Sequence, residues 1–341
     1  MNILDLFSGI GGFSLALKRA GFNIKNHYAS EVDKYAQWIY KYRFPKSIQL
    51  GDVTRIGNEH GKIDIITGGF PCQAFSIAGQ RKGFGDTRGT LFFEVERLAG
   101  IYKPKYMVLE NVKGLLNHDG GNTIRVILDE LRRLDYFVQL LVLNTVDFGI
   151  PQNRERCFFI CTASGERQPK ISHIREAKRE NTFSANCIYA NYYKGIDNHG
   201  QRTCIEVGTL RTHKDGEGFR KMQSDVCPTI PARAREDGSG QPVIMQKGRG
   251  YNKGGEKYIC PTLSSNSFEH NNHLKQDTII RRLTPIECER LQDYPDNWTQ
   301  YGINENGEQV EISDTQRYKT LGNSITVKVA EEIFKVIRGA L

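Results

Sequence analysis

The stretch that decides the fold is Asp5-Leu6-Phe7-Ser8-Gly9-Ile10-Gly11-Gly12, a glycine-rich turn that follows a short apolar run at residues 3–6. Glycines after a first strand let the backbone approach a ligand closely, and a helix begins directly behind them. The stretch therefore predicts a strand, a ligand-binding turn and a helix, which is how a doubly wound sheet begins.

Strand and helix patterns alternate from this turn to about residue 161. The predicted strands are 3–6, 24–30, 48–50, 63–67, 106–109, 138–143 and 157–161. The predicted helices are 13–20, 34–42, 91–101 and 123–134. Such alternation predicts an α/β fold built on a doubly wound, mainly parallel sheet.

The composition changes near Ala163, and from there to about Arg281 the chain is rich in Gly, Asn, Lys and Arg without a strong helical pattern. We interpret this stretch as a second, smaller, loop-rich β lobe. A helical signal returns at Thr284-Pro285-Ile286-Glu287, where Thr284 can cap a helix and Glu287 can close a capping box. The last helix, at 325–337, is expected to pack back on the first lobe.

The bulk numbers exclude several classes of protein. The 341 residues carry a net charge of +8, which is compatible with a polyanionic partner. No apolar run is long enough to cross a bilayer and no secretory signal opens the chain, so we expect a cytoplasmic protein without a membrane segment. The 8 cysteines are scattered without a CxxC pair, which argues against a zinc site and against a disulfide framework.

A reactive cysteine is placed where ligands sit in open α/β sheets. Cys72 lies in Gly68-Gly69-Phe70-Pro71-Cys72-Gln73, directly after a predicted strand, and the carboxyl ends of such strands line ligand sites. A nearby cation or helix start would favour its thiolate. The alternative is an inert core cysteine, which is the commoner case for a single cysteine.

Acids and arginines follow other predicted strands. Glu31 and Asp52 end the second and third strands, where acids can accept hydrogen bonds from a ribose or an adenine. Glu110 follows in Leu109-Glu110-Asn111-Val112, and Gln152-Asn153-Arg154-Glu155-Arg156 precedes the last strand of the series. Taken singly, Asp52 is more simply a turn or cap residue and Glu110 a solvated carboxylate at a strand end, and the arginine segment can be an exposed charged turn.

Together these segments resemble the cytosine-C5 DNA methyltransferase family of bacterial or phage type. The segments DLFSGIGG, GFPCQAFS, LENV and QNRERCFFI occur in that family's order, and LGNSI at 321–325 follows them. Smaller agreements are Glu31, Gly51-Asp52 and Arg88-Gly89-Thr90-Leu91-Phe92. The resemblance spans nearly the whole chain except the middle lobe.

The resemblance implies a methyl transfer from S-adenosylmethionine through a covalent cysteine adduct. Cys72 would attack carbon 6 of a cytosine, which makes carbon 5 nucleophilic. Glu110 would stabilise the charge at the ring N3, and Arg156, helped by Arg154 and Gln152, would contact O2. The residues expected around the cofactor are Phe7, Gly9, Gly11, Glu31, Asp52, Pro71, Leu91, Asn323 and Ser324.

The resemblance also implies double-stranded DNA as the substrate, with the target base flipped out of the helix. It divides the chain into a catalytic and cofactor-binding domain at 1–165, a target recognition domain at 166–282 and a return segment at 283–341. Residues 79–88 would form a loop that closes over the DNA. We expect a monomer whose restriction endonuclease, if one exists, is a functional and not a physical partner. The basic residues expected to serve target recognition are Lys214, Arg220, Arg233, Arg235, Lys247, Arg249 and Lys253.

Alternative functions are left open. The first is a cytosine-C5 methyltransferase acting on RNA, against which the large basic middle lobe argues. The second is a binding protein that kept the fold without activity, against which intact Cys72, Glu110 and Arg156 argue. An NAD enzyme would be expected to carry GxGxxG, and a methyltransferase for exocyclic nitrogen would carry [DNS]PP[YFW]; neither pattern stands at the corresponding segments.

Overall fold

The computed structural model describes residues 1–71, 91–171, 174, 209–210, 219–220, 243–246, 255–257, 260–262, 272–276 and 279–341. Its main element is a seven-stranded sheet in the order β3-β2-β1-β4-β5-β8-β6. These strands are β1 (Asn2–Leu6), β2 (Asn26–Ser30), β3 (Ile48–Gln49), β4 (Ile65–Gly69), β5 (Tyr106–Val112), β6 (Tyr136–Asn144) and β8 (Glu155–Ala163). Within this sheet β8 runs opposite in direction to the other six strands. The predicted α/β fold with a mainly parallel sheet is confirmed.

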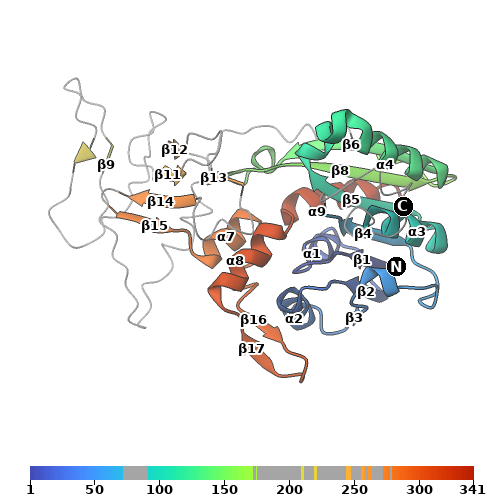
Figure 1. Cartoon of the computed structure of the whole chain (residues 1–341), viewed down its shortest axis with the longest axis horizontal. Coiled ribbons are helices and arrows are strands. Elements are labelled where there is room, and N and C mark those ends of the chain that lie inside the picture. The colour runs from blue at the N-terminus through green and yellow to red at the C-terminus, as the bar shows by residue number, and fades with distance from the viewer. Residues whose placement is uncertain are drawn as a thin grey trace.

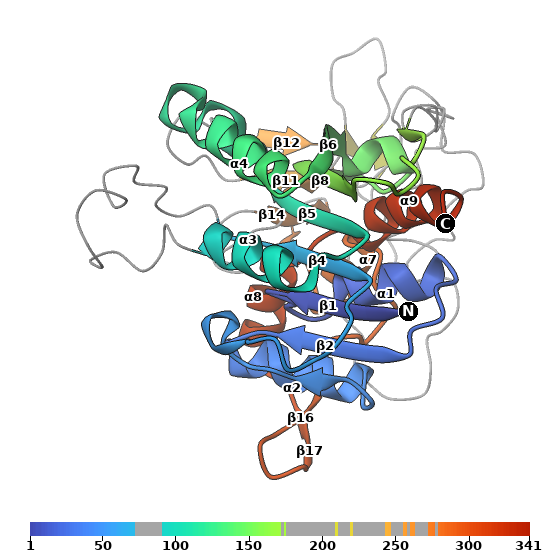
Figure 2. The same ribbon diagram turned by 90° about the vertical axis from the view of Figure 1, so that its right-hand side faces the viewer.

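Helices cover both faces of this sheet (Figure 2). They are α1 (Gly12–Arg19), α2 (Lys34–Arg43), α3 (Leu91–Tyr102), α4 (Asn122–Arg133), α7 (Pro285–Leu291), α8 (Asp314–Asn323) and α9 (Val327–Arg338), with short 3-10 turns η1 (Val53–Arg55), η3 (Lys113–Gly121) and η4 (Thr145–Phe148). Successive strand residues enter different cores: Ile3 packs with α1 and α9, whereas Leu4 packs with α3 and α4. Side chains alternate between the faces of a strand, so both must be apolar when both faces are covered.

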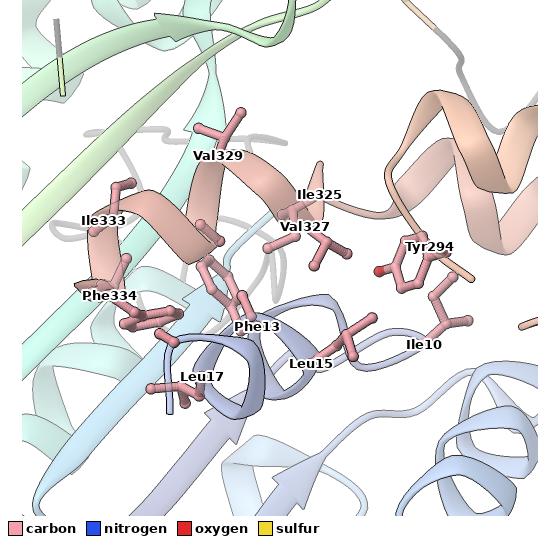
Figure 3. Packing of buried hydrophobic residues seen from close by; sticks show 14 of the residues in the cluster. Ile10, Phe13, Leu15, Leu17, Tyr294, Ile325, Val327, Val329, Ile333 and Phe334 are labelled. Atoms are coloured by element: carbon pink, nitrogen blue, oxygen red, sulfur yellow. The ribbon is translucent and has the colours of Figure 1, made fainter. Parts of the chain in front are cut away.

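The end of the chain returns to its beginning. In Figure 3 the side chains of α9 meet those of α1, and the rings of Phe13 and Phe334 pack edge to face with centroids 6.2 Å apart. The indole Nε1 of Trp298 donates to the carbonyl of Ile10 at 2.9 Å. Helix α7 begins with the predicted capping box of Thr284 and Glu287. The expectation that the last helix packs on the first lobe is therefore confirmed.

The elements described between 166 and 282 are all strands, and Figure 1 shows them to one side of the main sheet. Four of them pair antiparallel in the order β12-β11-β14-β15. Their bounds are β11 (Val243–Gln246), β12 (Gly255–Lys257), β14 (Asn272–Gln276) and β15 (Ile279–Arg282), beside a pair β9 (Thr209–Leu210) and β10 (Phe219–Arg220). The predicted domain boundaries stay predictions.

Two short pairings lie outside these sheets. Strand β13 (Cys260–Pro261) pairs in parallel with β7 (Gln152–Asn153), so part of the middle segment lies against the first lobe. A hairpin of β16 (Tyr301–Ile303) and β17 (Gln309–Glu311) follows α7. In the part of the chain that the structure describes, no helix has both the length and the apolar character needed to span a membrane.

Candidate active site

A cavity of about 570 Å³ opens at the carboxyl ends of the parallel strands. Ligands bind at this edge in open α/β sheets, and the volume is of the size that encloses a drug-sized ligand. The turn after β1 and strands β2, β4, β5 and β8 contribute to its wall, together with the start of α3 and the end of α8. The lining residues are Phe7, Gly9, Ser30, Glu31, Val32, Asp52, Val53, Gly69, Phe70, Pro71, Leu91, Glu110, Asn111, Val112, Arg154, Arg156, Gly322 and Asn323.

The glycine-rich turn is shaped so that its backbone faces the cavity. Gly9 has φ 53° and Gly11 has φ 87°, in the left-handed region that favours glycine. Phe7 also has a positive φ of 51°, which is uncommon for a residue with a side chain. Phe7 and Gly9 line the cavity, and Gly11 does not. A Cβ atom at Gly11 would overlap the ring of Phe44, so Gly11 serves the packing of the turn.

The Glu31 carboxylate ties the turn to the next strand. Its Oε2 accepts a hydrogen bond from the Gly9 amide at 2.8 Å. Its Oε1 accepts from the amides of Val32 and Asp33, each at 2.8 Å. A carboxylate has about four acceptor sites, and three are used here. Glu31 can therefore accept a further bond from a ligand hydroxyl while it holds the backbone in place.

Asp52 lines the same cavity, but it does not end a strand as predicted. Strand β3 stops at Gln49, and Asp52 instead caps the 3-10 turn that begins at Val53. Its Oδ1 accepts from the Thr54 amide at 3.0 Å and from the Thr54 hydroxyl at 2.9 Å. These bonds hold the pKa of Asp52 below its ordinary value, so the carboxylate remains a hydrogen-bond acceptor. Asp52 therefore caps the 3-10 turn and lines the cavity at the same time.

The carboxyl group of Glu110 and the guanidinium group of Arg156 are paired where β5 and β8 adjoin. The Glu110 Oε1 lies 2.9 Å from Nε of Arg156, and both residues line the cavity. Burial raises the pKa of Glu110, although the positive charges of Arg156 and Arg154 oppose that rise. The carboxyl group therefore keeps a proton at higher pH than an exposed glutamate does, which suits a group that protonates or hydrogen-bonds a substrate.

Asn111 is a site residue that sequence reasoning did not single out. Its Nδ2 donates to the carbonyl of Phe70 at 2.8 Å, and its Oδ1 accepts from the Val112 amide at 2.8 Å. It thereby fixes the end of β4, just before Pro71, against β5. The signal was present in the sequence, because Asn111 stands beside Glu110 in the LENV segment.

The second end of the chain supplies one wall. Asn323 and Gly322, at the end of α8, line the cavity, whereas the predicted Ser324 does not. The Ser324 hydroxyl is buried and hydrogen-bonded to the Tyr294 hydroxyl. Leu91, at the start of α3, lines the cavity as expected for a site residue. Ser324 therefore serves the packing behind the wall.

The two arginines of the QNRER segment both line the cavity, and Gln152 of that segment does not. Gln152 is fully buried in β7. Cys72 and the predicted loop at 79–88 lie outside the described residues. Pro71, to which Cys72 is bonded, lines the cavity. Among the described residues no group of three or more His, Cys, Asp and Glu side chains could hold a metal ion.

Comparison with known proteins adds independent findings. The family model for C-5 cytosine-specific DNA methylase matches residues 1–339. Type II methyltransferase M.HhaI of Haemophilus parahaemolyticus is 33% identical over 345 residues, covering 98% of this chain and 93% of that protein. Type II methyltransferase M.HaeII of Haemophilus aegyptius is 36% identical over 334 residues, covering 97% and 90%. The crystal structure of S. pombe Dnmt2 methyltransferase matches with a TM-score of 0.67 over 99% of both chains at 18% identity, which shows a shared fold alone.

Proposed function

The chain belongs to the family of C-5 cytosine-specific DNA methylases, and from this premise we propose that it moves a methyl group from S-adenosylmethionine to carbon 5 of a flipped-out cytosine in double-stranded DNA. It is a DNA (cytosine-5-)-methyltransferase by its family and its relatives. One observation carries the finer proposal. A single cavity is bounded by Glu31 and Asp52 beyond β2 and β3, and by the Glu110–Arg156 pair on β5 and β8.

The β1–β3 side of the cavity fits an adenosyl group. Glu31 keeps an acceptor site for a ribose hydroxyl, and Asp52 is an ionised acceptor for an adenine amino group. Phe7 and Leu91 supply apolar wall, and Asn323 closes the site from the far end of the chain. When bound, S-adenosylmethionine would supply the electrophilic methyl group that carbon 5 takes up.

The β4–β8 side suits a pyrimidine. Cys72, as thiolate, forms a bond to carbon 6, and the electron pair of the 5,6 double bond moves onto carbon 5. Glu110 holds a proton at N3 as charge develops there, and Arg156 donates to O2, with Arg154 behind it. After methyl transfer, which would leave S-adenosylhomocysteine, solvent water takes the proton from carbon 5. The electron pair of that bond restores the 5,6 double bond, and the carbon 6–sulfur bond breaks to release Cys72 as thiolate. Support comes from the raised pKa of Glu110 and from Pro71 in the cavity wall.

Carbon 5 of a paired cytosine lies inside the duplex, so the target base must leave the duplex to reach this cavity. The net charge of +8 favours binding to phosphates. We assign target reading to 166–282, chemistry and cofactor binding to 1–165, and completion of the site to 283–341. The relatives are named type II methyltransferases, which supports a restriction-modification or phage-protection role. We expect a cytoplasmic monomer whose restriction endonuclease, if one exists, is a functional and not a physical partner.

Covalent trapping tests the proposal. Bisulfite sequencing of DNA from an expressing host first identifies the methylated sequence. A duplex with 5-fluorocytosine at that position is then incubated with protein and S-adenosylmethionine. Because fluorine on carbon 5 cannot leave as a proton, the Cys72–carbon 6 bond should persist, and a protein–DNA complex should survive denaturing electrophoresis.

Matched variants make the test specific. Cys72→Ala should form no complex, while Cys288→Ala should form as much as the parent, because burial raises the pKa of the Cys288 thiol and leaves it inert. An RNA of the same sequence should remain untrapped. A complex with Cys72→Ala would refute the mechanism, and trapping of RNA but not DNA would favour the RNA alternative.

A further inference from the structure

Arg154 is a buried cation that the chemistry of the base does not fully explain. The residue is 3% exposed, and a charge at such a position is costly unless it is hydrogen-bonded. Its Nη2 donates to the carbonyl of Gly322 at 3.5 Å and, more closely, to the carbonyl of Ser324. Those two carbonyls flank Asn323, which lines the cavity. The guanidinium is therefore hydrogen-bonded to the backbone on both sides of Asn323.

The backbone carbonyls that accept these hydrogen bonds lie at the carboxyl end of a helix. Helix α8 ends at Asn323 with Ser324 as its cap residue. The last carbonyls of a helix have no partner within the helix, and the negative end of the helix dipole favours a cation there. The carbonyl of Leu321 is accounted for by the Ser324 amide at 3.1 Å. Arg154 supplies donors to the carbonyls that follow, although it stands 168 residues earlier than Gly322.

Thr145, at the start of η4, holds the backbone of Arg154 in this position. The Arg154 carbonyl accepts from the Thr145 amide at 3.0 Å. The Thr145 hydroxyl pairs with the Thr326 hydroxyl at 3.0 Å, and Thr326 lies just beyond the segment that Arg154 contacts. The backbone and the side chain of Arg154 are thus both linked to the return segment. Arg154 is therefore anchored at its backbone carbonyl and at the Nη2 end of its side chain.

The two arginines of this segment have different partners. Arg156 pairs with Glu110 through Nε at 2.9 Å, whereas Nη2 of Arg154 donates to carbonyls at the end of α8. Burial lowers the pKa of Arg154 to about 9, and the nearby Arg156 charge adds to that effect. The cost of burying this second charge is consistent with a positional role at the helix end.

We propose that Arg154 is a positioning residue: it holds the segment 322–324 against the cavity, and so sets the affinity for the adenosyl cofactor without touching the cytosine. The inference rests on the proposed function. Arginine suits this place because the two N–H groups of Nη2 lie in the fixed plane of the guanidinium and donate to both carbonyls, whereas the ammonium of lysine is a point charge on a flexible stem. Loss of these hydrogen bonds releases the segment that carries Asn323 and lowers the affinity for the cofactor. A residue on the base side of the cavity thereby affects binding on the cofactor side.

The test is the affinity of Arg154→Lys for S-adenosylhomocysteine, measured calorimetrically without DNA and well below the unfolding temperature. The expected Kd is roughly tenfold or more weaker than in the parent, from the loss of a charge-assisted bond. Hydrogen exchange of the amides at 322–324 should also become faster in the variant. The matched control is Arg156→Lys, which should keep the parent Kd while covalent trapping of DNA falls.

Each outcome decides something. An unchanged Kd in Arg154→Lys overturns the inference, and loss of DNA trapping with an unchanged Kd shows instead that Arg154 contacts the base. A lower unfolding temperature with an unchanged Kd shows a merely structural role. Should Arg154→Lys and Arg154→Gln both fail to fold, the residue serves the fold as a whole and the inference is overturned. If the parent itself binds no S-adenosylhomocysteine, the proposed function fails as well.

Discussion

Glu110 and Arg156 are joined diagonally across two neighbouring antiparallel strands, with 2.9 Å between Oε1 and Nε. The register sets Glu110 opposite Phe158, and Arg156 opposite Val112. Diagonal neighbours on one face of a sheet lie within reach of long side chains. Burial raises the pKa of Glu110 against the influence of this partner. The pair therefore presents a carboxyl group whose proton is available above the usual range of a glutamate.

The first prediction concerns the proton on Glu110. Glu110→Gln should lower the single-turnover rate of methylation by roughly 100-fold or more, since general-acid assistance at N3 is lost. In the parent, the rate should fall as pH rises through the Glu110 pKa, which lies above 4.5. That alkaline limb should vanish in the variant, because an amide does not titrate.

Its control is Glu155→Gln, which removes the neighbouring exposed carboxylate that pairs with Lys113 at 2.9 Å. This variant should keep both the rate and the alkaline limb. The same limb in Glu110→Gln as in the parent would assign the titration to another group and remove Glu110 from the proton transfer.

The second prediction concerns the partly buried imidazole of His27, which contacts hydroxyl groups of α1 and α2. His27 Nε2 lies 2.6 Å from the Tyr40 hydroxyl and 2.9 Å from the Ser14 hydroxyl, and burial lowers its pKa from 6.5 to about 4. As pH falls from about 7 to 5, the unfolded chain binds a proton there that the folded chain does not, so stability is lost, by about 2 kcal/mol. His27→Gln should remove this loss.

The measurement is the free energy of unfolding of both proteins across that pH range. Asp5 lies in the same network, and burial raises its pKa to about 6. Its contribution has the opposite sign: the folded chain gains a proton as pH falls through about 6, which adds stability down to the unfolded pKa. Asp5 is present in both proteins, so their difference reports His27. Parallel pH curves would contradict the prediction.

The third prediction concerns the contact between the two ends of the chain. A Cβ atom at Gly12 would lie 2.5 Å from the Tyr294 hydroxyl and 2.6 Å from Cγ1 of Ile325. Gly12→Ala should therefore lower the free energy of unfolding by about 1–3 kcal/mol through overpacking. Gly114→Ala is the control, because no atom lies within 4 Å of its added Cβ. Denaturant titration compares the free energies of unfolding of the two variants. Equal values would show that Tyr294 and Ile325 move aside to accommodate the added methyl group, which would contradict the prediction.

Local sequence was sufficient for much of the fold. Apolar runs of strand length and the turn at Gly9 and Gly11 predicted where strands and helices lie, because side-chain periodicity and backbone freedom are properties of neighbouring residues. The residues at strand ends were likewise predicted to share one edge of the sheet. Glu31, Asp52, Glu110 and Arg156 do share it. Glu31 and Glu110 lie there because they stand at the carboxyl ends of parallel strands, whereas Arg156 reaches the same edge from the start of antiparallel β8.

Other features depended on contacts between residues far apart in the chain. No local pattern shows that β8 inserts antiparallel between β5 and β6, that Asp52 caps a 3-10 turn, or that Ser324 turns toward Tyr294 and away from the cavity.

The sequence alone determined the elements, the family resemblance and the edge at which the site lies, because these follow from local pattern. Only the tertiary structure decided that Arg154 is hydrogen-bonded to carbonyls at the end of α8 while Arg156 pairs with Glu110. Two arginines two residues apart have the same local chemistry, and their partners are chosen by which distant groups remain unsatisfied once the chain has packed.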